Sequence, residues 1–363
     1  MKKIDWYILG IFLKTFFFSI FLFALIAVAI DASEKSEDFI RSNLSFVEVF
    51  RLYYVGFIPH IVTLLFPVFV LVSVVFFTSR LAMRSEIVAM LSTGMSLARI
   101  LRPFWVGGIF LALLLGFSNH FLIPPANKIR TDFEYKYIHM GSLDGNSTQY
   151  LTNLHFRVDS NTYAGIRSFD TVTKRGEGFF LSRLKGGKLH ENIRSEIIIW
   201  DSVKKEWKLE NVIERKLDGL NEEVVEHTVY PIKIGYKPSD LTHDEYMKDK
   251  LKTPALNDLI EKEERRGSEA VVPLRFERYR RDANAVSVIV MTLIAGILAS
   301  RKIRGGSGFH MALAFVIGVT FILVDKFSMV FCTKGNLNPF VAAWLPAALF
   351  GYVTIHLYRQ APK

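Results

Sequence analysis

The stretch RSEIVAMLSTGMSLARILRP, residues 84–103, lies between two long apolar runs and is itself amphipathic. It begins at Arg84 and contains one carboxylate, Glu86, with small residues at Ala89, Ser92 and Gly94. At helical spacing its apolar side chains share one face, whereas Glu86 and Ala89 lie toward the other. The pattern therefore predicts a short amphipathic helix over about residues 84–98. Its apolar face comprises Ile87, Met90, Leu91 and Met95.

Six windows of the chain are long and apolar enough to cross a bilayer, which takes about 20 mostly apolar residues. Their charges lie at the edges, except for Asp325 and Lys326 deep in the fifth window. This pair indicates an ionisable site within the membrane or an early helix end, and we favour a position near the far surface, which long side chains can reach. The windows are residues 8–30, 57–78, 104–123, 283–299, 309–331 and 339–358.

The composition fits a chain that is partly in the membrane and partly in water. Half of the 363 residues are hydrophobic, yet 22% are charged. The single cysteine, Cys332, excludes an internal disulfide framework and a four-thiolate metal site. We expect no nucleic-acid partner despite the net charge of +10, because the placement of the charges matters more than their sum.

The cations of the short loops all fall on one side of the membrane, which the positive-inside rule assigns to the cytoplasm. We therefore expect both termini to be cytoplasmic. The loop after the first window is acidic and the loop after the fifth carries only Lys334, as expected outside. The cytoplasmic cations are Lys2, Lys3, Arg80, Arg84, Arg99, Arg102, Arg301, Lys302, Arg304, Arg359 and Lys363.

Residues 126–282, between the third and fourth windows, are numerous enough for a domain with its own core. Short segments rich in β-branched and aromatic residues alternate there with polar turns and predict an antiparallel sandwich or jelly roll. One of them predicts a hairpin in which Trp200 and Trp207 flank a polar turn. The predicted strands are HFRVDS, TYAGIRSFD, GFFLSRL, SEIIIWD, EWKLENVIERKL and VVEHTVYPIKI.

The domain boundaries follow from these segments. Residues 1–125 hold transmembrane helices 1–3, residues 126–250 an all-β domain outside the cytoplasm, residues 251–282 a helical connector, and residues 283–363 transmembrane helices 4–6. The fold class is thus an α-helical integral membrane protein with six transmembrane helices and an inserted, jelly-roll-like β domain.

Motifs for catalysis or metal binding are incomplete. SRLKGGKLH lacks the first glycine and the magnesium-binding Ser or Thr of a phosphate loop. HENIR has Arg194 where a zinc protease has its second histidine, and no Gly-x-Ser-x-Gly elbow occurs. We therefore expect no catalytic residue, metal or cofactor on this chain.

Two electrostatic features have alternative interpretations. One feature is a collar of cations, formed by Lys128 and Arg130 after the third window and by Arg275, Arg278, Arg280 and Arg281 before the fourth. These cations either contact headgroups and form local pairs, such as Glu277 with Arg281, or bind lipid phosphates. The amphipathic helix is either an interfacial connector or a docking helix for a cytoplasmic partner. We favour docking, because small residues rather than Lys and Arg occupy its polar face.

SEIVAMLSTGMS resembles the coupling-helix signature of the lipopolysaccharide-export permeases, the LptF/LptG family. The similarity covers the whole chain. The motifs similar to that family are KKIDWYILGIFLKTF at the start, RGGSG before the fifth window and LNPFVAAWLPAALF in the sixth. Members of the family have three helices, a periplasmic β-jelly-roll and three further helices. The opening and FILVDKF resemble the G-type subunit more than the F-type.

The resemblance implies a permease subunit of an ABC-type exporter in the inner membrane of Gram-negative bacteria. It implies a homologous second permease, a cytoplasmic ATPase dimer that holds ATP and Mg, and a periplasmic bridge protein that receives lipopolysaccharide through the jelly roll. The implied ATPase-docking residues are Arg84, Glu86, Ile87, Ala89, Met90, Ser92, Gly94 and Met95.

The resemblance also implies that the first and fifth helices line the lipid cavity and gate. This chain departs from the family pattern at two positions. Some members place a cation late in the first helix to meet a lipid phosphate, whereas this chain has Val28 there and Lys35 about two turns later. Relatives often have a proline early in the fourth helix, where this chain has Ala285. We hypothesise phosphate contacts at Lys35, Lys128, Arg130, Arg278 and Arg281. The implied cavity and gate residues are Phe23, Ala27, Val28, Phe315, Val319, Asp325 and Lys326.

Two other functions compete with a permease. A mechanotransmission subunit would couple an ATPase to a periplasmic partner without passing lipid, and it would keep the docking helix but need no apolar cavity. A membrane-anchored enzyme would need a catalytic constellation in the β domain, and the sequence contains none that we recognise.

Overall fold

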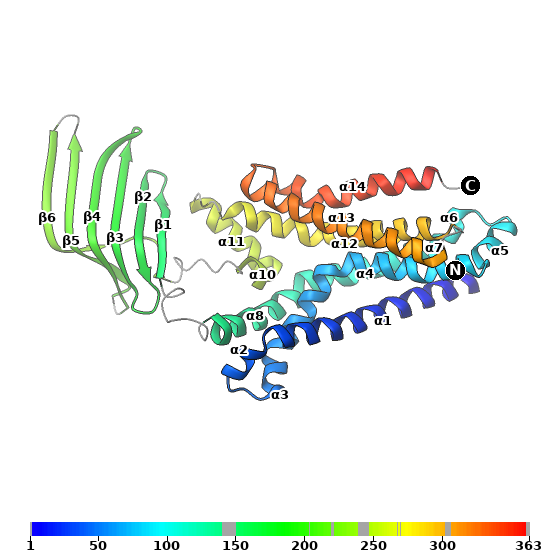
Figure 1. Cartoon of the computed structure of the whole chain (residues 1–363). Helices are drawn as coiled ribbons and strands as arrows, with labels where there is room; N and C mark the ends of the chain where they lie inside the picture. Colours follow the sequence, from blue (N-terminus) through cyan, green and yellow to red (C-terminus); the bar gives the residue numbers. More distant parts are fainter. Residues whose placement is uncertain are drawn as a thin grey trace. The chain divides into compact units, whose positions relative to one another are not determined.

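The computed structural model describes residues 2–139, 150–202, 204–218, 221–238, 247–266, 268, 270–301 and 306–360. The chain divides into two compact units, one of residues 1–133, 248–257 and 272–363 and one of residues 134–247 and 258–271. The first contains the long helices and the second contains the sheet (Figure 1). Arg304 and the glycine after it in the RGGSG motif lie outside the described residues, as do Lys302 and Lys363.

Among the described residues, six helical segments are long and apolar enough to cross a membrane, and each contains one of the predicted windows. The first, fourth, fifth and sixth are single helices: α1 (Lys3–Glu34), α12 (Val271–Ala299), α13 (Gly306–Lys334) and α14 (Pro339–Arg359). The second joins α3 (Phe46–Val49), the π-helix η1 (Phe50–Tyr54) and α4 (Val55–Met83), and the short α2 (Ser36–Arg41) precedes it. The third joins α6 (Leu97–Ile100), α7 (Arg102–Phe117), η2 (Ser118–Leu122), α8 (Ile123–Phe133) and η3 (Glu134–His139).

The π-helix η2 in the third span has a local cause in the sequence. Pro124 and Pro125 follow it after Ile123, and neither has a backbone N–H to donate to the preceding turn. A widened turn is one way in which a helix accommodates such missing hydrogen bonds. This turn carries Asn119 and His120, both of which make contacts described below.

Aromatic side chains form the centre of the helical unit. Phe12 of α1, Phe77 of α4 and Phe104 of α7 stack on one another, with ring centroids 5.7–6.5 Å apart. Gly107 of α7 lies against the same Phe12 ring, where a Cβ atom would come within 2.4 Å of it. The glycine therefore allows α1 and α7 to approach closely.

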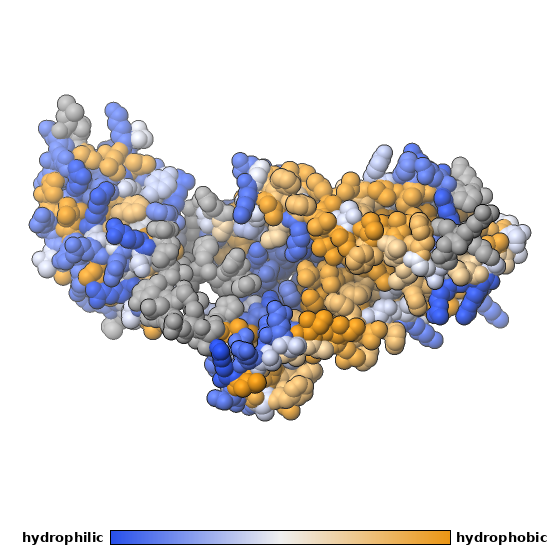
Figure 2. All heavy atoms as spheres, in the orientation of Figure 1, coloured by the Kyte–Doolittle hydropathy of each residue, from blue (hydrophilic) through white to orange (hydrophobic). Residues whose placement is uncertain are grey.

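Two of the six spans remain mostly uncovered within this chain. Only 11% of the most apolar window of α1 and 22% of that of α13 is buried, against 61% for α12. Figure 2 shows hydrophobic residues over the middle of the helical unit, whereas the sheet unit is mainly hydrophilic on the same face. The exposed apolar surfaces of α1 and α13 are therefore available to lipid or to another chain.

The second unit contains a six-stranded antiparallel sheet whose strands follow one another in sequence order. Every predicted strand is confirmed, and Trp200 pairs directly with Trp207 across the predicted hairpin. The inserted β domain is thus confirmed, but its described strands form a sequential meander rather than the two packed sheets of a jelly roll. The strands are β1 (Tyr150–Asp159), β2 (Thr162–Asp170), β3 (Arg175–Lys185), β4 (Lys188–Asp201), β5 (Glu206–Asp218) and β6 (Asn221–Ile232).

One face of the sheet carries the core of this unit. Trp207 is 1% exposed, packs edge-on against Phe169, and donates from its indole nitrogen to the carbonyl of Tyr236 at 2.7 Å. The Tyr236 hydroxyl in turn donates to the carbonyl of Arg157 on β1. The segment after β6 therefore crosses the core face of the sheet, and its Tyr236 carbonyl accepts the hydrogen bond that the buried Trp207 indole requires.

The chain returns to the helices through α10 (Met247–Lys250) and α11 (Thr253–Arg266). The predicted boundary at residue 283 falls inside a helix, because α12 begins at Val271. Its charged first half stays helical since its side chains pair at i,i+4, Glu277 with Arg281 and Arg278 with Asp282.

Candidate docking helix and polar network

The predicted amphipathic helix is present as α5 (Glu86–Ser92). Ile87 and Met90 are 2% and 8% exposed and belong to the core of the helical unit, with Leu91 and Met95 packed against it. The apolar face predicted from the sequence is therefore the face by which α5 is held.

The helix is shorter than the predicted range 84–98. Ser85 precedes it in the left-handed region at φ 59°, and Gly94 follows it at φ 83°. Ser96 then caps the next helix, α6, by accepting from the backbone N–H of Arg99. A glycine in the left-handed region ends a helix, so the segment divides into two short helices.

The other side of α5 is accessible in this chain. Ala89, Ser92 and Gly94 are exposed, as is Arg84 just before the helix, and Glu86 is half-buried. Small exposed residues on a helix that is anchored from behind form a surface which another protein can approach closely. Docking of a partner at this face stays a prediction.

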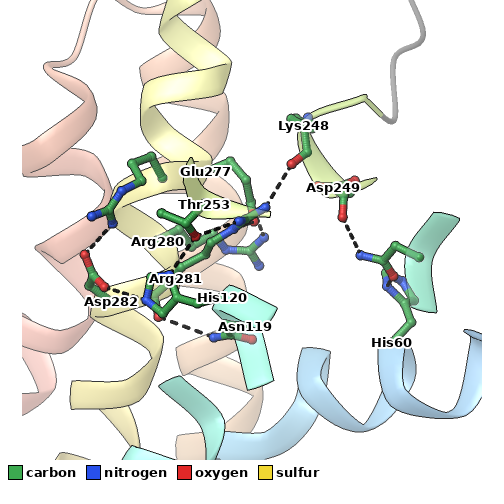
Figure 3. A network of polar contacts seen from close by, with 12 residues as sticks. His60, Asn119, His120, Lys248, Asp249, Thr253, Glu277, Arg280, Arg281 and Asp282 are labelled. Atoms are coloured by element: carbon green, nitrogen blue, oxygen red, sulfur yellow. Dashed lines mark hydrogen bonds and ion pairs between the residues drawn. The ribbon is translucent and has the colours of Figure 1, made fainter. Parts of the chain in front are cut away.

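At the other end of the helical unit, a polar network joins α10 and α11 to the long helices (Figure 3). His120 of η2 lies at its centre, with Nδ1 2.6 Å from Thr253 Oγ1 and Nε2 3.0 Å from Asp282 Oδ1. Arg278 donates to the other oxygen of Asp282 at 2.6 Å. Asn119, next to the histidine, donates to the carbonyl of Arg281.

Arg281 is the most enclosed cation of the network, with a side chain 4% exposed. Its guanidinium donates to the Thr253 hydroxyl and to the Lys248 carbonyl, each at 3.0 Å, and its Nε lies 3.4 Å from a Glu277 oxygen. The side chain thus ties α12 to the returning segment. The local Glu277–Arg281 pair considered from the sequence is present.

Arg280 connects α12 to α13. Its Nη2 lies 2.8 Å from Asp325 Oδ2, and the two side chains are 19% and 14% exposed. Glu277 lies within 3.8 Å of the same guanidinium. Asp325 is therefore half of an interhelical ion pair, and α13 does not end there but continues to Lys334.

A second chain of hydrogen bonds reaches α4. His60 Nδ1 lies 2.9 Å from Asn127 Oδ1, and the Asn127 amide donates to the carbonyl of Asp249 at 3.0 Å. Burial, together with the nearby charge of Glu277, raises the pKa of the Asp249 carboxyl to about 6. Lys248, Arg280 and Arg281 act in the opposite direction.

The residues of the hypothesised phosphate-binding collar lie in unlike environments. Arg278 and Arg281 are engaged within the network, Arg130 is half-buried, and Lys128 is exposed on α8. Lys35 is paired with Asp31 at 3.0 Å and lies over the ring of Tyr53. Among these five cations, Lys128 is the one whose side chain is open to a ligand.

The predicted cavity and gate residues lie on the two least covered helices. Phe315 and Val319 of α13 are 69% and 39% exposed, and Lys326 is exposed as well. On α1, Ala27 and Val28 are half-buried. Phe23 of α1 packs against Phe69 of α4 with ring centroids 4.3 Å apart.

The contacts of several members of the network were not predicted from the sequence; these members are His120, Asn127, Asp249, Thr253 and Arg280. Their contact partners lie up to 162 residues away along the sequence, as for His120 and Asp282. No periodicity connects such positions. The one available signal was chemical, since a histidine and an asparagine at the end of an apolar span need polar partners.

No group of three or more His, Cys, Asp or Glu side chains that could hold a metal ion occurs in the described residues. The six spans, the inserted sheet and the anchored amphipathic helix define a polytopic membrane protein with an inserted β domain. A family model described as lipopolysaccharide export system permease LptF/LptG matches residues 6–360, nearly the whole chain. The chain belongs to this family and is a permease component of lipopolysaccharide export in the inner membrane. No curated protein matches it.

Proposed function

We propose that this chain is one permease subunit of an ABC-type exporter that extracts lipopolysaccharide from the inner membrane and passes it to a periplasmic bridge protein. A homologous second permease and a cytoplasmic ATPase dimer, which holds ATP and Mg, complete the assembly. Both termini and α5 lie in the cytoplasm, and the sheet lies in the periplasm. FILVDKF favours the G-type role for this subunit.

The proposal rests on the two unlike faces of α5. Its apolar face is buried in the helical unit through Ile87 and Met90, while its small residues remain exposed. A helix fixed in this way transmits a displacement of its outer face to the helices behind it, because a close-packed interior does not absorb the movement. Force from a partner ATPase could therefore enter the membrane helices at α5.

The apolar surfaces of α1 and α13 support lipid passage rather than mechanical coupling alone. Phe315 is 69% exposed on α13, and large apolar residues such as Phe18 and Phe21 are 67% and 62% exposed on α1. Two uncovered helices of this kind can face a homologous subunit across a space that accepts acyl chains. A purely mechanical subunit has no need of such a space.

Photo-crosslinking in cells tests this proposal. A photoreactive residue replacing Phe315 or Phe23 should form adducts with lipopolysaccharide, and the same residue at Tyr352, which is exposed on α14, serves as the control. Adducts at the first two positions that depend on an active partner ATPase support a lipid path. Co-purification of the ATPase without lipid adducts at either position would instead favour the mechanotransmission function.

A further inference from the structure

A pocket of about 500 Å³ lies where the first turns of α1 and α7 meet α6. It is separate from the exposed face of α5 and from the polar network. Three cations and one carboxylate line it, with two apolar side chains beside them. The lining residues are Lys2, Asp5, Arg99, Arg102, Trp105 and Val106.

The charges of this pocket are only partly balanced. Asp5 is 3% exposed and accepts from Arg99 Nη2 at 2.8 Å and from the backbone N–H of Lys2 at 2.7 Å. The Asp5 carboxylate therefore balances the charge of Arg99. Lys2 and Arg102 are exposed and form no ion pair within the described part of the chain. The pocket thus presents two unbalanced positive charges.

An apolar stripe leads away from the pocket along α7. Trp105 and Val106 are 46% and 42% exposed, and the residues at helical spacing beyond them, such as Phe110 and Leu113, are 49% and 69% exposed. A tryptophan at the end of an exposed apolar helix face is typical of the membrane–water interface. This pattern predicts that the pocket lies at headgroup level, where a surface for acyl chains begins.

We propose that this pocket binds the phosphate of an anionic phospholipid, with the acyl chains along the α7 stripe. Arg102 can contact phosphate oxygens through its planar guanidinium, and Lys2 adds a second charge. An acidic protein segment would satisfy the cations equally well, but it would leave the stripe uncovered. Phospholipid binding at this pocket is a function separate from lipopolysaccharide export. It requires only that α1 and α7 cross the membrane.

Native mass spectrometry of the full chain, purified with its partner subunits, measures this binding directly. The probes are phosphatidylglycerol, phosphatidylethanolamine and soluble glycerol phosphate. We expect retained phosphatidylglycerol adducts whose affinity falls by about tenfold or more in the Lys2→Gln, Arg102→Gln double variant, because the variant removes both unbalanced cations beside the phosphate. Phosphatidylethanolamine should bind more weakly in both proteins.

The matched control is the Lys3→Gln, Arg359→Gln double variant, which removes two exposed cations outside the pocket. Its adducts should equal those of the wild type. Equal loss in both variants, or no loss in the pocket variant, overturns the site. Binding of glycerol phosphate as tight as that of the lipid overturns the role of the stripe, and a crosslink from position 102 to the ATPase without any lipid adduct assigns the pocket to protein docking instead.

Discussion

At the residue scale, Arg280 and Asp325 are the charged pair that joins two membrane helices. Leaving one of two enclosed charges without its partner costs about 3 kcal/mol or more. Arg280→Gln should therefore lower the thermal stability of the detergent-purified protein substantially. The Asp325→Asn change added to it should recover part of the loss, and a double variant whose loss equals the sum of the two single losses would show that the pair is uncoupled.

Asp249 gives the polar network a dependence on pH. Its folded pKa of about 6 lies above the ordinary aspartate value of 3.8, so the folded state favours the protonated carboxyl. The stability that this group contributes is fully present below about pH 3.8 and is lost as the pH rises through about 6. Thermal melts should shift upward between pH 7 and pH 5, and Asp249→Asn should flatten that part of the profile. An unchanged profile in this variant would assign the shift to other groups.

At the scale of the element, α5 combines a buried face with an exposed one. Glu86→Lys should reduce co-purification of the partner ATPase by about tenfold or more, because a reversed charge in a docking face opposes its former partner. The amount of protein in the membrane should be unchanged. Glu37→Lys, at an exposed carboxylate of α2, is the control and should have no effect. Normal ATPase binding by the Glu86 variant would make α5 a simple connector.

The end of α5 depends on a glycine. Gly94 has φ 83° with open space around it, so an added Cβ meets no neighbour and the cost is conformational. Gly94→Ala should destabilise the protein by about 1 kcal/mol. Gly10→Ala, within α1 and with equally open space, should be neutral or slightly stabilising. Similar melting temperatures for the two variants would show that the turn relaxes.

At the scale of the whole molecule, the two units have separate cores and should lose stability separately. Trp207→Ala removes the largest buried side chain of the sheet and should cost about 3–5 kcal/mol there. Limited proteolysis should then cut within residues 134–247 while the long helices stay protected. Trp200→Ala, at its half-buried neighbour, should have a smaller effect. Simultaneous loss of both units would indicate that they unfold together.

The sequence by itself determined the six spans, the six strands, the Trp200–Trp207 hairpin and the buried face of α5. Each depends on a local pattern, either helical or strand periodicity or a long apolar run, and such patterns are written in neighbouring residues. The family resemblance also rested on short local motifs.

Only the tertiary structure decided which polar groups meet. His120 reaches Thr253 and Asp282, and Arg280 reaches Asp325, through contacts between segments that no local pattern relates. The same holds for the sequential order of the strands and for the pocket at Lys2 and Arg102. Enclosed charges require partners, but the identity of each partner depends on how the helices pack.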